Sequence, residues 1–206
     1  QCYTTEESQK LGVPVSLYDQ IGQNKDVTVG AAVRFCNPVA KTLENGDETE
    51  ILNLDHHLSF YEVAVSKHID TPSVRVSNQF GENQKLEIDQ PFALAVPAQK
   101  TTPGRHQRPE GLDHFMCYNV SQGNAVGQNV GLTDQFLNSS QPRLVDQPVL
   151  LCNPVVKTFN DDVSEMLSPN DHLTCYQIVG DPLGIDVVIN TQFGDDGFKV
   201  PSADML

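Results

Sequence analysis

The sequence predicts an all-β protein built from four tandem repeats of about 58 residues, and three observations support this class. A Cys-Tyr or Phe-Tyr pair, the marker pair, opens each repeat, and its first residue, the marker position, stands at 2, 60, 117 and 175, which are 58, 57 and 58 residues apart. Short runs of alternating apolar and polar residues, bounded by Gly, Pro, Asn and Asp, recur in every repeat, as is typical of β-strands. No window keeps the apolar spacing of an amphipathic helix for three turns.

Each repeat is expected to contain four strands in the same order. A short aromatic-rich run comes first, at 1–3, 55–61, 113–118 and 171–176. An alternating run that reaches a recurrent Gln follows, at 15–22, 74–81, 130–136 and 187–194. A brief third run and a fourth run that closes on proline lie within 33–41, 85–100, 143–157 and 198–206. Asp-Gln-Pro at 89–91 and 146–148 should separate these two runs, because proline cannot donate to a central ladder.

The repeats are expected to pair into two β-sandwich or barrel-like domains, 1–106 and 107–206, the second lacking its last strand. The connector at 102–112 is poor in apolar residues and contains two prolines and two glycines. The connectors at 43–54 and 159–170 instead carry apolar side chains that could pack. This contrast places the domain boundary near residue 107.

The cysteine pattern predicts two disulfide bonds. Cys36 and Cys152 occupy the same position in the last strands of the first and third repeats. The second repeat has Ala95 at that position and Phe60 at its opening position, so it has lost both cysteines together. Joint loss is expected of covalent partners, because an unpaired thiol is a liability in an oxidising compartment. The predicted pairs are Cys2–Cys36 and Cys117–Cys152, each closing a loop of about 35 residues and worth about 3–4 kcal/mol.

Cys175 is left without a partner in this scheme. Alignment of the third and fourth repeats places its expected partner one residue beyond Leu206, and the chain also opens in the middle of a strand. Either the natural array is longer, which is the simpler explanation, or neighbouring chains complete the fourth repeat. The sheet containing Val187–Asn190 is then expected to have an unpaired edge, covered by a segment outside 171–206. Head-to-tail self-assembly through an adjacent copy is therefore expected, with a downstream segment of a longer chain as the alternative.

Composition limits the partners and the compartment. The net charge of −14 argues against binding to nucleic acid or to anionic membrane surfaces. No stretch approaches the length of a membrane-spanning helix, so membrane insertion is not expected. A disulfide framework requires an oxidising environment, which predicts an extracellular or cell-surface location for a chain whose signal peptide has been removed.

One family resemblance follows from these motifs. The pattern Asp-His-x-x-Cys-Tyr, Asp-Gln-Phe-Gly and Leu-Leu-Cys-x-Pro-x-x-Lys resembles an uncharacterised repeat domain of secreted bacterial and archaeal proteins. It is matched best at 113–118, 134–136 and 150–157. The resemblance implies an extracellular β-rich domain with no assigned activity and no known catalytic residues. The second repeat departs from the pattern at Phe60 and Ala95.

Searching for catalytic patterns gives no candidate. His57, His114 and His172 precede the marker position by three residues, but a metal site needs two or more converging ligands and no such spacing occurs. They are expected to cap the start of a strand. No Gly-x-Ser-x-Gly turn and no glycine-rich phosphate loop is present, so no catalytic residue is predicted and the chain is not expected to be an enzyme. A glutamine recurs in every second run, and we expect it to close a turn rather than bind a ligand. These are Gln20, Gln79, Gln135 and Gln192.

Two acidic connectors, with a third acidic turn at 195–197, provide the cofactor candidates. Carboxylates and amides in flexible loops suit Ca²⁺, although the spacing does not match an EF-hand. The candidate calcium ligands are Asn45, Asp47, Glu48, Asn160, Asp161 and Asp162. No other cofactor is expected. Asn119 and Asn138 begin glycosylation sequons.

These features favour a non-enzymatic extracellular structural protein, a subunit of a filament, surface layer or adhesive assembly. The alternative is a secreted calcium- or carbohydrate-binding module. The chain has no Trp, and most of its five Tyr belong to the marker pairs, which disfavours sugar binding because sugar platforms use exposed aromatic rings.

Overall fold

The computed structural model describes residues 1–66, 68, 70–101, 109–137 and 139–206, and these ranges contain strands and turns but no helix. The all-β class is therefore confirmed. In chain order the strands are β1 (Cys2–Thr4), β2 (Val13–Asp19), β3 (Gly22–Cys36), β4 (Ala40–Leu43), β5 (Glu48–Thr49), β6 (His57–Val65), β7 (Ser73–Asn78), β8 (Gly81–Lys100), β9 (Phe115–Gln122), β10 (Gln128–Thr133), β11 (Gln141–Val145), β12 (Pro148–Pro154), β13 (Val156–Phe159), β14 (Asp162–Ser164), β15 (Leu173–Tyr176), β16 (Pro182–Thr191) and β17 (Gly194–Met205).

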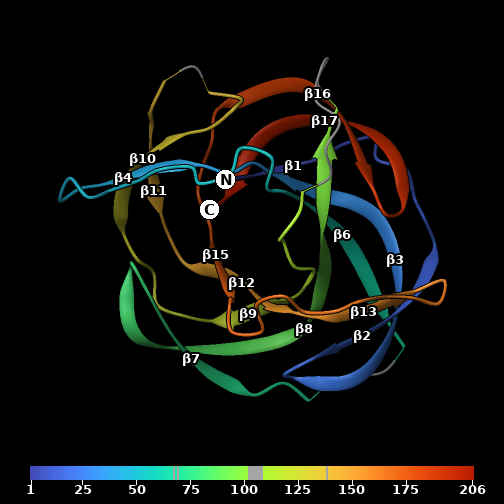
Figure 1. Ribbon diagram of the computed structural model, residues 1–206. Coiled ribbons are helices and arrows are strands. Elements are labelled where there is room, and N and C mark those ends of the chain that lie inside the picture. Colours follow the sequence, from blue (N-terminus) through green and yellow to red (C-terminus); the bar gives the residue numbers. More distant parts are fainter. Residues whose placement is uncertain (67, 69, 102–108, 138) are drawn as a thin grey trace.

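The first and last strands of the repeats form a closed ring, which we call the central ring. Its antiparallel neighbours follow the order β1, β3, β6, β8, β9, β12 and β15. The ring closes through β17, which pairs with β1 and continues beside β15. There the Tyr176 and Leu206 backbones exchange hydrogen bonds of 2.7 and 2.8 Å. Figure 1 shows the strands curving around a common centre, with the two chain ends close together.

Alternation along the ring strands separates two apolar clusters. Successive side chains of a strand point to opposite faces, so in a closed ring one face becomes the interior. The interior cluster contains Phe60, Ala95 and the cysteines together with Met205. The opposite face carries Tyr3, Tyr61 and their equivalents, which belong to the larger outer cluster. Both clusters draw on strands from the whole length of the chain.

Four hairpins cover the outside of the ring and bury the outer cluster. They are β2–β3, β7–β8, β10–β11 and β16–β17, one from each sequence repeat. Alternating burial in β2, where Val15, Leu17 and Asp19 face inward, matches the period-2 pattern that predicted this strand. The hairpins therefore pack their apolar faces against the tyrosine face of the ring.

In the first three repeats, the segment after the last ring strand pairs with a hairpin strand of the repeat two positions away. β4 of the first repeat pairs with β10 of the third, and β13 of the third repeat pairs with β2 of the first. The end of β8, in the second repeat, pairs with β16 of the fourth at Ile189↔Lys100. Repeats that are two apart in the sequence are therefore hydrogen-bonded to each other.

This pairing corrects the expected division at residue 107. β8 and β9, on either side of that boundary, pair from Glu87↔Gln122 to Ala95↔Phe115. Both apolar clusters also combine residues from 1–106 and 107–206. The boundary position itself lies outside the described residues. The apolar-poor connector thus joins two neighbouring ring strands rather than two separate domains.

Two local expectations also need correction. Asp-Gln-Pro at 89–91 does not end a strand, because β8 runs through it with register shifts at Ile88/Pro91 and Pro91/Ala93. A bulge places the proline where no ladder hydrogen bond is required. The edge beside Val187–Asn190 is covered by a segment outside 171–206, as expected, but that segment is the end of β8 of the same chain, after which Thr101 N–H donates to the Val188 carbonyl at 2.8 Å.

The ring register predicts that a third disulfide can be built into the second repeat. Phe60 lies directly opposite Ala95, as Cys2 lies opposite Cys36. We expect Phe60→Cys alone to destabilise the protein by about 2–4 kcal/mol through loss of a buried aromatic ring. The double variant Phe60→Cys with Ala95→Cys should form a bond and recover part of that loss. Non-reducing peptide mass spectrometry checks the bond, and two free thiols after oxidation would contradict the register.

Candidate functional site

The ring interior holds a layer of sulfur and aromatic side chains at the marker positions. The structure contains the disulfides Cys2–Cys36 and Cys117–Cys152, the two pairs predicted from joint replacement. Phe60 and Ala95 fill the corresponding space in the second repeat, with exposures of 1% and 0%. Each bond fixes the register between a first and a last ring strand, and a one-residue slip there would turn every side chain to the wrong face.

Cys175 holds the fourth place in this layer as a free thiol. It is buried, and burial raises the pKa of its thiol to about 12. The thiolate is the nucleophilic form of cysteine, so this raised pKa slows reactions of the free thiol at neutral pH. A buried thiol of this kind behaves as a small apolar side chain until a partner reaches it.

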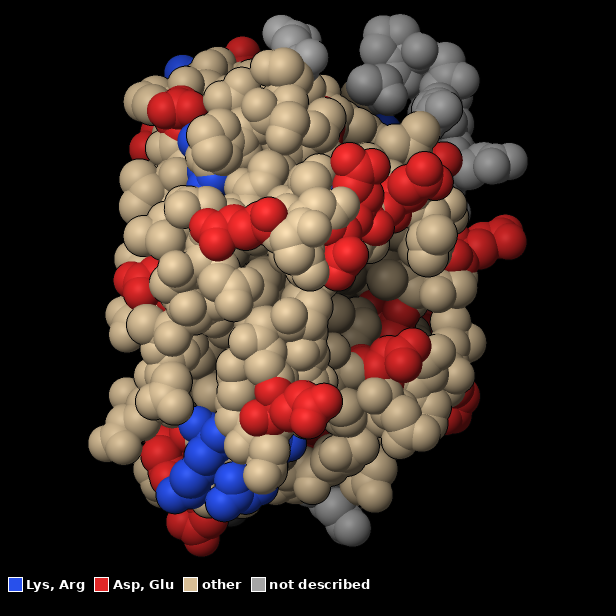
Figure 2. All heavy atoms as spheres, turned by 90° about the vertical axis from the view of Figure 1, so that its left-hand side faces the viewer, with Lys and Arg blue, Asp and Glu red and all other residues tan. Residues whose placement is uncertain are grey.

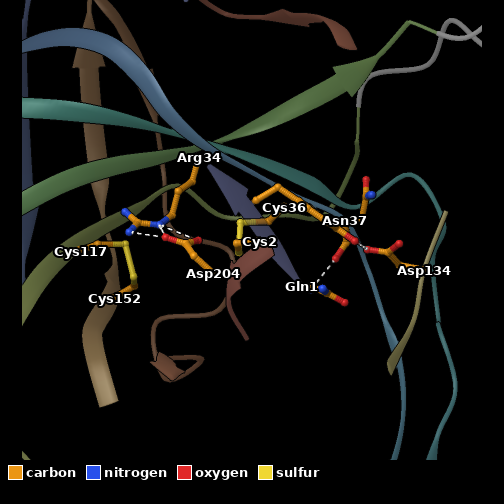
Figure 3. The surroundings of a disulfide bond; sticks show 10 residues. Gln1, Cys2, Arg34, Cys36, Asn37, Cys117, Asp134, Cys152 and Asp204 are labelled. Atoms are coloured by element: carbon orange, nitrogen blue, oxygen red, sulfur yellow. Dashed lines mark hydrogen bonds and ion pairs between the residues drawn. A yellow bond between two sulfur atoms is a disulfide. The ribbon is translucent and has the colours of Figure 1, made fainter. Parts of the chain in front are cut away.

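An ion pair lies beside the sulfur layer. The Arg34 guanidinium donates from Nε and Nη2 to the Asp204 carboxylate at 3.0 and 2.8 Å. The guanidinium also lies over the Phe92 ring, 5.3 Å from its centroid. Figure 3 shows this pair together with both disulfides. Asp204 belongs to the fourth repeat and Arg34 to the first, so this contact helps to hold β17 in the ring.

Two tyrosine–aspartate hydrogen bonds connect the first and third repeats reciprocally. The Tyr3 hydroxyl donates to Asp134 Oδ2 and the Tyr118 hydroxyl donates to Asp19 Oδ2, both at 2.6 Å. Both tyrosines are fully buried. Burial and the adjoining carboxylate raise the pKa of each tyrosine well above its ordinary value. Each bond therefore links the hairpin turn of one of these two repeats to a ring strand of the other.

The second and fourth repeats make the same kind of reciprocal tyrosine contacts, but with neutral side chains in place of the aspartates. The Tyr61 hydroxyl lies 3.3 Å from Thr191 Oγ1, and Asn78 Nδ2 donates to the Tyr176 hydroxyl at 2.8 Å. The same turn residues also accept a hydrogen bond from the backbone N–H two residues later. For Asp19 that donor is Ile21, at 2.9 Å. The residue before the recurrent glutamine therefore closes the turn.

The recurrent glutamines have a different role from the expected one. Three of them accept a hydrogen bond from a lysine of the preceding repeat instead of closing their own turns. The pairs are Lys41–Gln79, Lys100–Gln135 and Lys157–Gln192. Burial lowers the pKa of Lys157 to about 8. The sequence signal for this contact was a lysine five residues after each of Cys36, Ala95 and Cys152. The spacing did not show which glutamine that lysine contacts.

The histidines before the marker positions occupy three different environments. His57 is buried and stacks on Phe35, with ring centroids 5.4 Å apart. His114 Nε2 lies 3.2 Å from Gln192 Oε1, and His172 Nδ1 lies 3.0 Å from Asn153 Oδ1. Burial lowers the pKa of both His57 and His114 to about 4. The rings of His57 and His114 therefore act as neutral packing and hydrogen-bonding groups at neutral pH.

The candidate calcium ligands lie in two exposed hairpin turns. Asn45 Nδ2 donates to Asp47 Oδ2 at 2.8 Å within the β4–β5 turn. Glu48 is the first residue of β5. The other candidates, Asn160, Asp161 and Asp162, lie at the β13–β14 turn, and β4 and β13 belong to different sheets. Across the described ranges, no three His, Cys, Asp or Glu side chains are grouped so that they could hold a metal ion. Asn119 is exposed in β9, and Asn138 lies outside the described residues.

A cavity of about 670 Å³ opens between β7, β15 and the ends of β1 and β3, and we call it the groove. The side chains that bear on its chemistry are Gln20, Asn37, Val76, His172 and Cys175. Asn37 is only 3% exposed, and neither of its side-chain polar atoms has a hydrogen-bond partner in the described part of the chain. The groove therefore combines a buried thiol with unpaired polar groups.

Comparison with known families identifies one match. A family model described as a repeat of unknown function (DUF7450) matches residues 57–206. No curated protein and no solved structure matches the chain. The match agrees with the expectation of an uncharacterised repeat family.

The tyrosine–aspartate bonds predict a selective effect of one hydroxyl. Tyr118→Phe removes a donor from the buried Asp19 carboxylate, so the free energy of unfolding should fall by about 1–3 kcal/mol. Tyr18→Phe is the matched control, because Tyr18 is 42% exposed and should change stability by less than about 0.5 kcal/mol. Chemical denaturation measures both. Equal effects of the two changes would mean that the turn contact contributes nothing.

His57, which is buried, and His114, which is partly buried, predict a loss of stability in acid. Their pKa is near 6.5 when unfolded and about 4 when folded, so the unfolded chain binds more protons as pH falls. The histidine contribution is intact above pH 6.5 and is lost between about 6.5 and 4. It should amount to on the order of 3 kcal/mol for the buried His57 and less for the partly buried His114.

Denaturation at several pH values tests this histidine effect. His57→Asn with His114→Asn should flatten the dependence, whereas replacement of the exposed His68 should leave it unchanged. An unaltered slope in the double variant would refute the assignment.

Proposed function

The chain belongs to the family of repeats of unknown function that matches its residues 57–206, and we propose that it is a non-enzymatic structural protein of an extracellular assembly. A filament, a surface layer or an adhesive stalk would use such a subunit. The two disulfide bonds support an oxidising environment for the folded chain.

The observation that carries this proposal is the interlocking of the repeats. Each hairpin turn is bonded to a tyrosine two repeats away, and each ring strand is paired with neighbours on both sides over most of the ring. Such cross-connection resists local opening, because no single repeat can unfold without breaking contacts in another. Mechanical or proteolytic resistance is what an extracellular structural subunit requires.

The surface charge disfavours nucleic acid as a partner, because both surfaces would be negative. Figure 2 shows acidic side chains spread over one face, with basic side chains gathered mainly near its lower end. The net charge is −14 at pH 7. Within the described residues there is no helix of the length and apolarity needed to cross a membrane.

Aromatic exposure favours the structural role over carbohydrate binding. The chain has no Trp and five Tyr, and four of these tyrosines are at most 2% exposed because they pack against the hairpins. Tyr18, at 42%, is the one tyrosine with a substantially open ring. Sugar-binding surfaces use several exposed aromatic faces, so this surface is poorly suited to that task.

Negative-stain electron microscopy of the purified oxidised protein tests the proposal. We expect regular oligomers or fibres that persist at physiological salt, because the interface would be built from strand pairing rather than exposed charge. Sizing chromatography over a range of concentrations provides the control. Monodisperse monomers at all concentrations, together with saturable binding to a glycan array or to Ca²⁺, would favour the binding-module alternative.

A further inference from the structure

We propose that the groove is a strand-acceptor site, which binds an extended peptide from a second chain with the pattern Cys-Asn-Pro-x-x-Lys. The pattern is that of the chain's own segments 36–41 and 152–157, with a variant at 95–100. The proposal deepens the proposed function, on which the choice of a second chain as the source rests.

Three equivalent positions in the structure are already filled by such a segment. In each case the lysine pairs through its backbone with the residue three before a recurrent glutamine. The three pairs are Lys41↔Leu132, Lys100↔Ile189 and Lys157↔Leu17. β7 has no such partner among the described strands and pairs with β8 alone. The same rule places the lysine of an incoming peptide opposite Val76, which lines the groove.

Gln20 provides the matching acceptor for the lysine side chain. Its Nε2 donates to the Pro169 carbonyl at 3.2 Å, just as Gln135 Nε2 donates to the Leu54 carbonyl at 2.6 Å. Gln135 Oε1 is then free to accept from Lys100. Gln20 lines the groove in the same arrangement, and no described lysine side chain donates to it. A cation at that point would complete the fourth lysine–glutamine contact.

Cys175 provides the covalent partner. In the third repeat Tyr118 pairs with Leu151, and the neighbouring Cys117 is bonded to Cys152. Tyr176 and Leu206 exchange backbone hydrogen bonds in the same way, so Cys175 faces the next position along that line, inside the groove. A peptide cysteine at this position would complete the sulfur layer of the ring.

Asn37 supports the site independently. It lines the groove at 3% exposure, with Oδ1 and Nδ2 lacking partners in the described part of the chain. Figure 3 shows Asn37 next to Cys36 at this end of the ring. A buried, unpaired amide is costly, and an incoming strand carries backbone donors and acceptors that would relieve that cost. The three matching segments within residues 1–206 are already paired, so none of them is the occupant, and the choice of a second chain rests on the proposed assembly.

A synthetic peptide tests the proposal directly. The peptide Leu-Cys-Asn-Pro-Val-Val-Lys-Thr, copied from 151–158, carries its cysteine as a mixed disulfide with 2-thiopyridine. The Cys175 thiol loses its proton to solvent and attacks the peptide sulfur. A new S–S bond forms, the bond to thiopyridine breaks, and pyridine-2-thione leaves with the electron pair and takes up a proton. Intact mass should show one peptide per chain, linked at Cys175.

Noncovalent recognition is measured with the Cys175→Ser variant and a peptide whose Cys is replaced by Ser. Hydrogen exchange should slow in 73–78 and 173–176 when this peptide binds. Replacement of the peptide lysine by Ala, or of Gln20 by Ala, should weaken binding about tenfold. Gln128→Ala, at an exposed position in β10, is the matched control and should change nothing.

The result that would overturn the site is equal capture of a scrambled peptide, or no capture and no change in exchange. This readout uses a purified chain and a peptide, so it does not depend on whether assemblies are seen by microscopy. Peptide capture without assemblies would contradict the structural role but not the acceptor site. Assemblies without peptide capture would contradict the acceptor site alone.

Discussion

Closure of the central ring is the constraint on which the rest of the structure depends. A strand in the ring satisfies its backbone groups only when a partner lies on each side, and an exposed edge is both costly and prone to pair with other chains. Each first strand, such as β9, lies between two last strands, here β8 and β12. The disulfides fix the register at which closure occurs, and the hairpins pack against a face that exists only once the strands have curved into a ring.

Reciprocal contacts between repeats two apart in the sequence make the unfolding of the ring cooperative. Hairpin turns of the first and third repeats are bonded to each other's tyrosines, and β4 and β13 extend each other's hairpins in the same reciprocal way. Neither half of the chain contains both members of these contacts. Contacts between residues far apart in the sequence cost loop-closure entropy. The two disulfides reduce that cost, because they constrain the unfolded chain. The stability of each repeat therefore depends on the repeat two positions away as well as on its neighbours in the sequence.

Comparison of the four repeats with one another predicted the structural features that depend on a residue's position within its own repeat. The all-β class followed from period-2 alternation, and the disulfide pairs followed from the joint change at Phe60 and Ala95, since a covalent pair must be lost together. Contacts between repeats could not be predicted in this way, because spacing does not show which repeat lies opposite which. Lys41 and Gln79 recur as visibly as the cysteines do, yet their contact depends on how the ring curves. The connector near 107 was misinterpreted for the same reason, since its composition does not show that β8 and β9 pair.

The central claim is that residues 1–101 and 109–206 form one cooperative unit. Native-state hydrogen exchange, followed by mass spectrometry at increasing denaturant, tests this most directly because it reports the opening free energy of each strand. The account predicts that slowly exchanging amides in β3 and β6 converge on the same global free energy and denaturant dependence as those in β9 and β12. Two distinct free energies, one for each half of the chain, would show that the halves unfold independently and would contradict the closed ring.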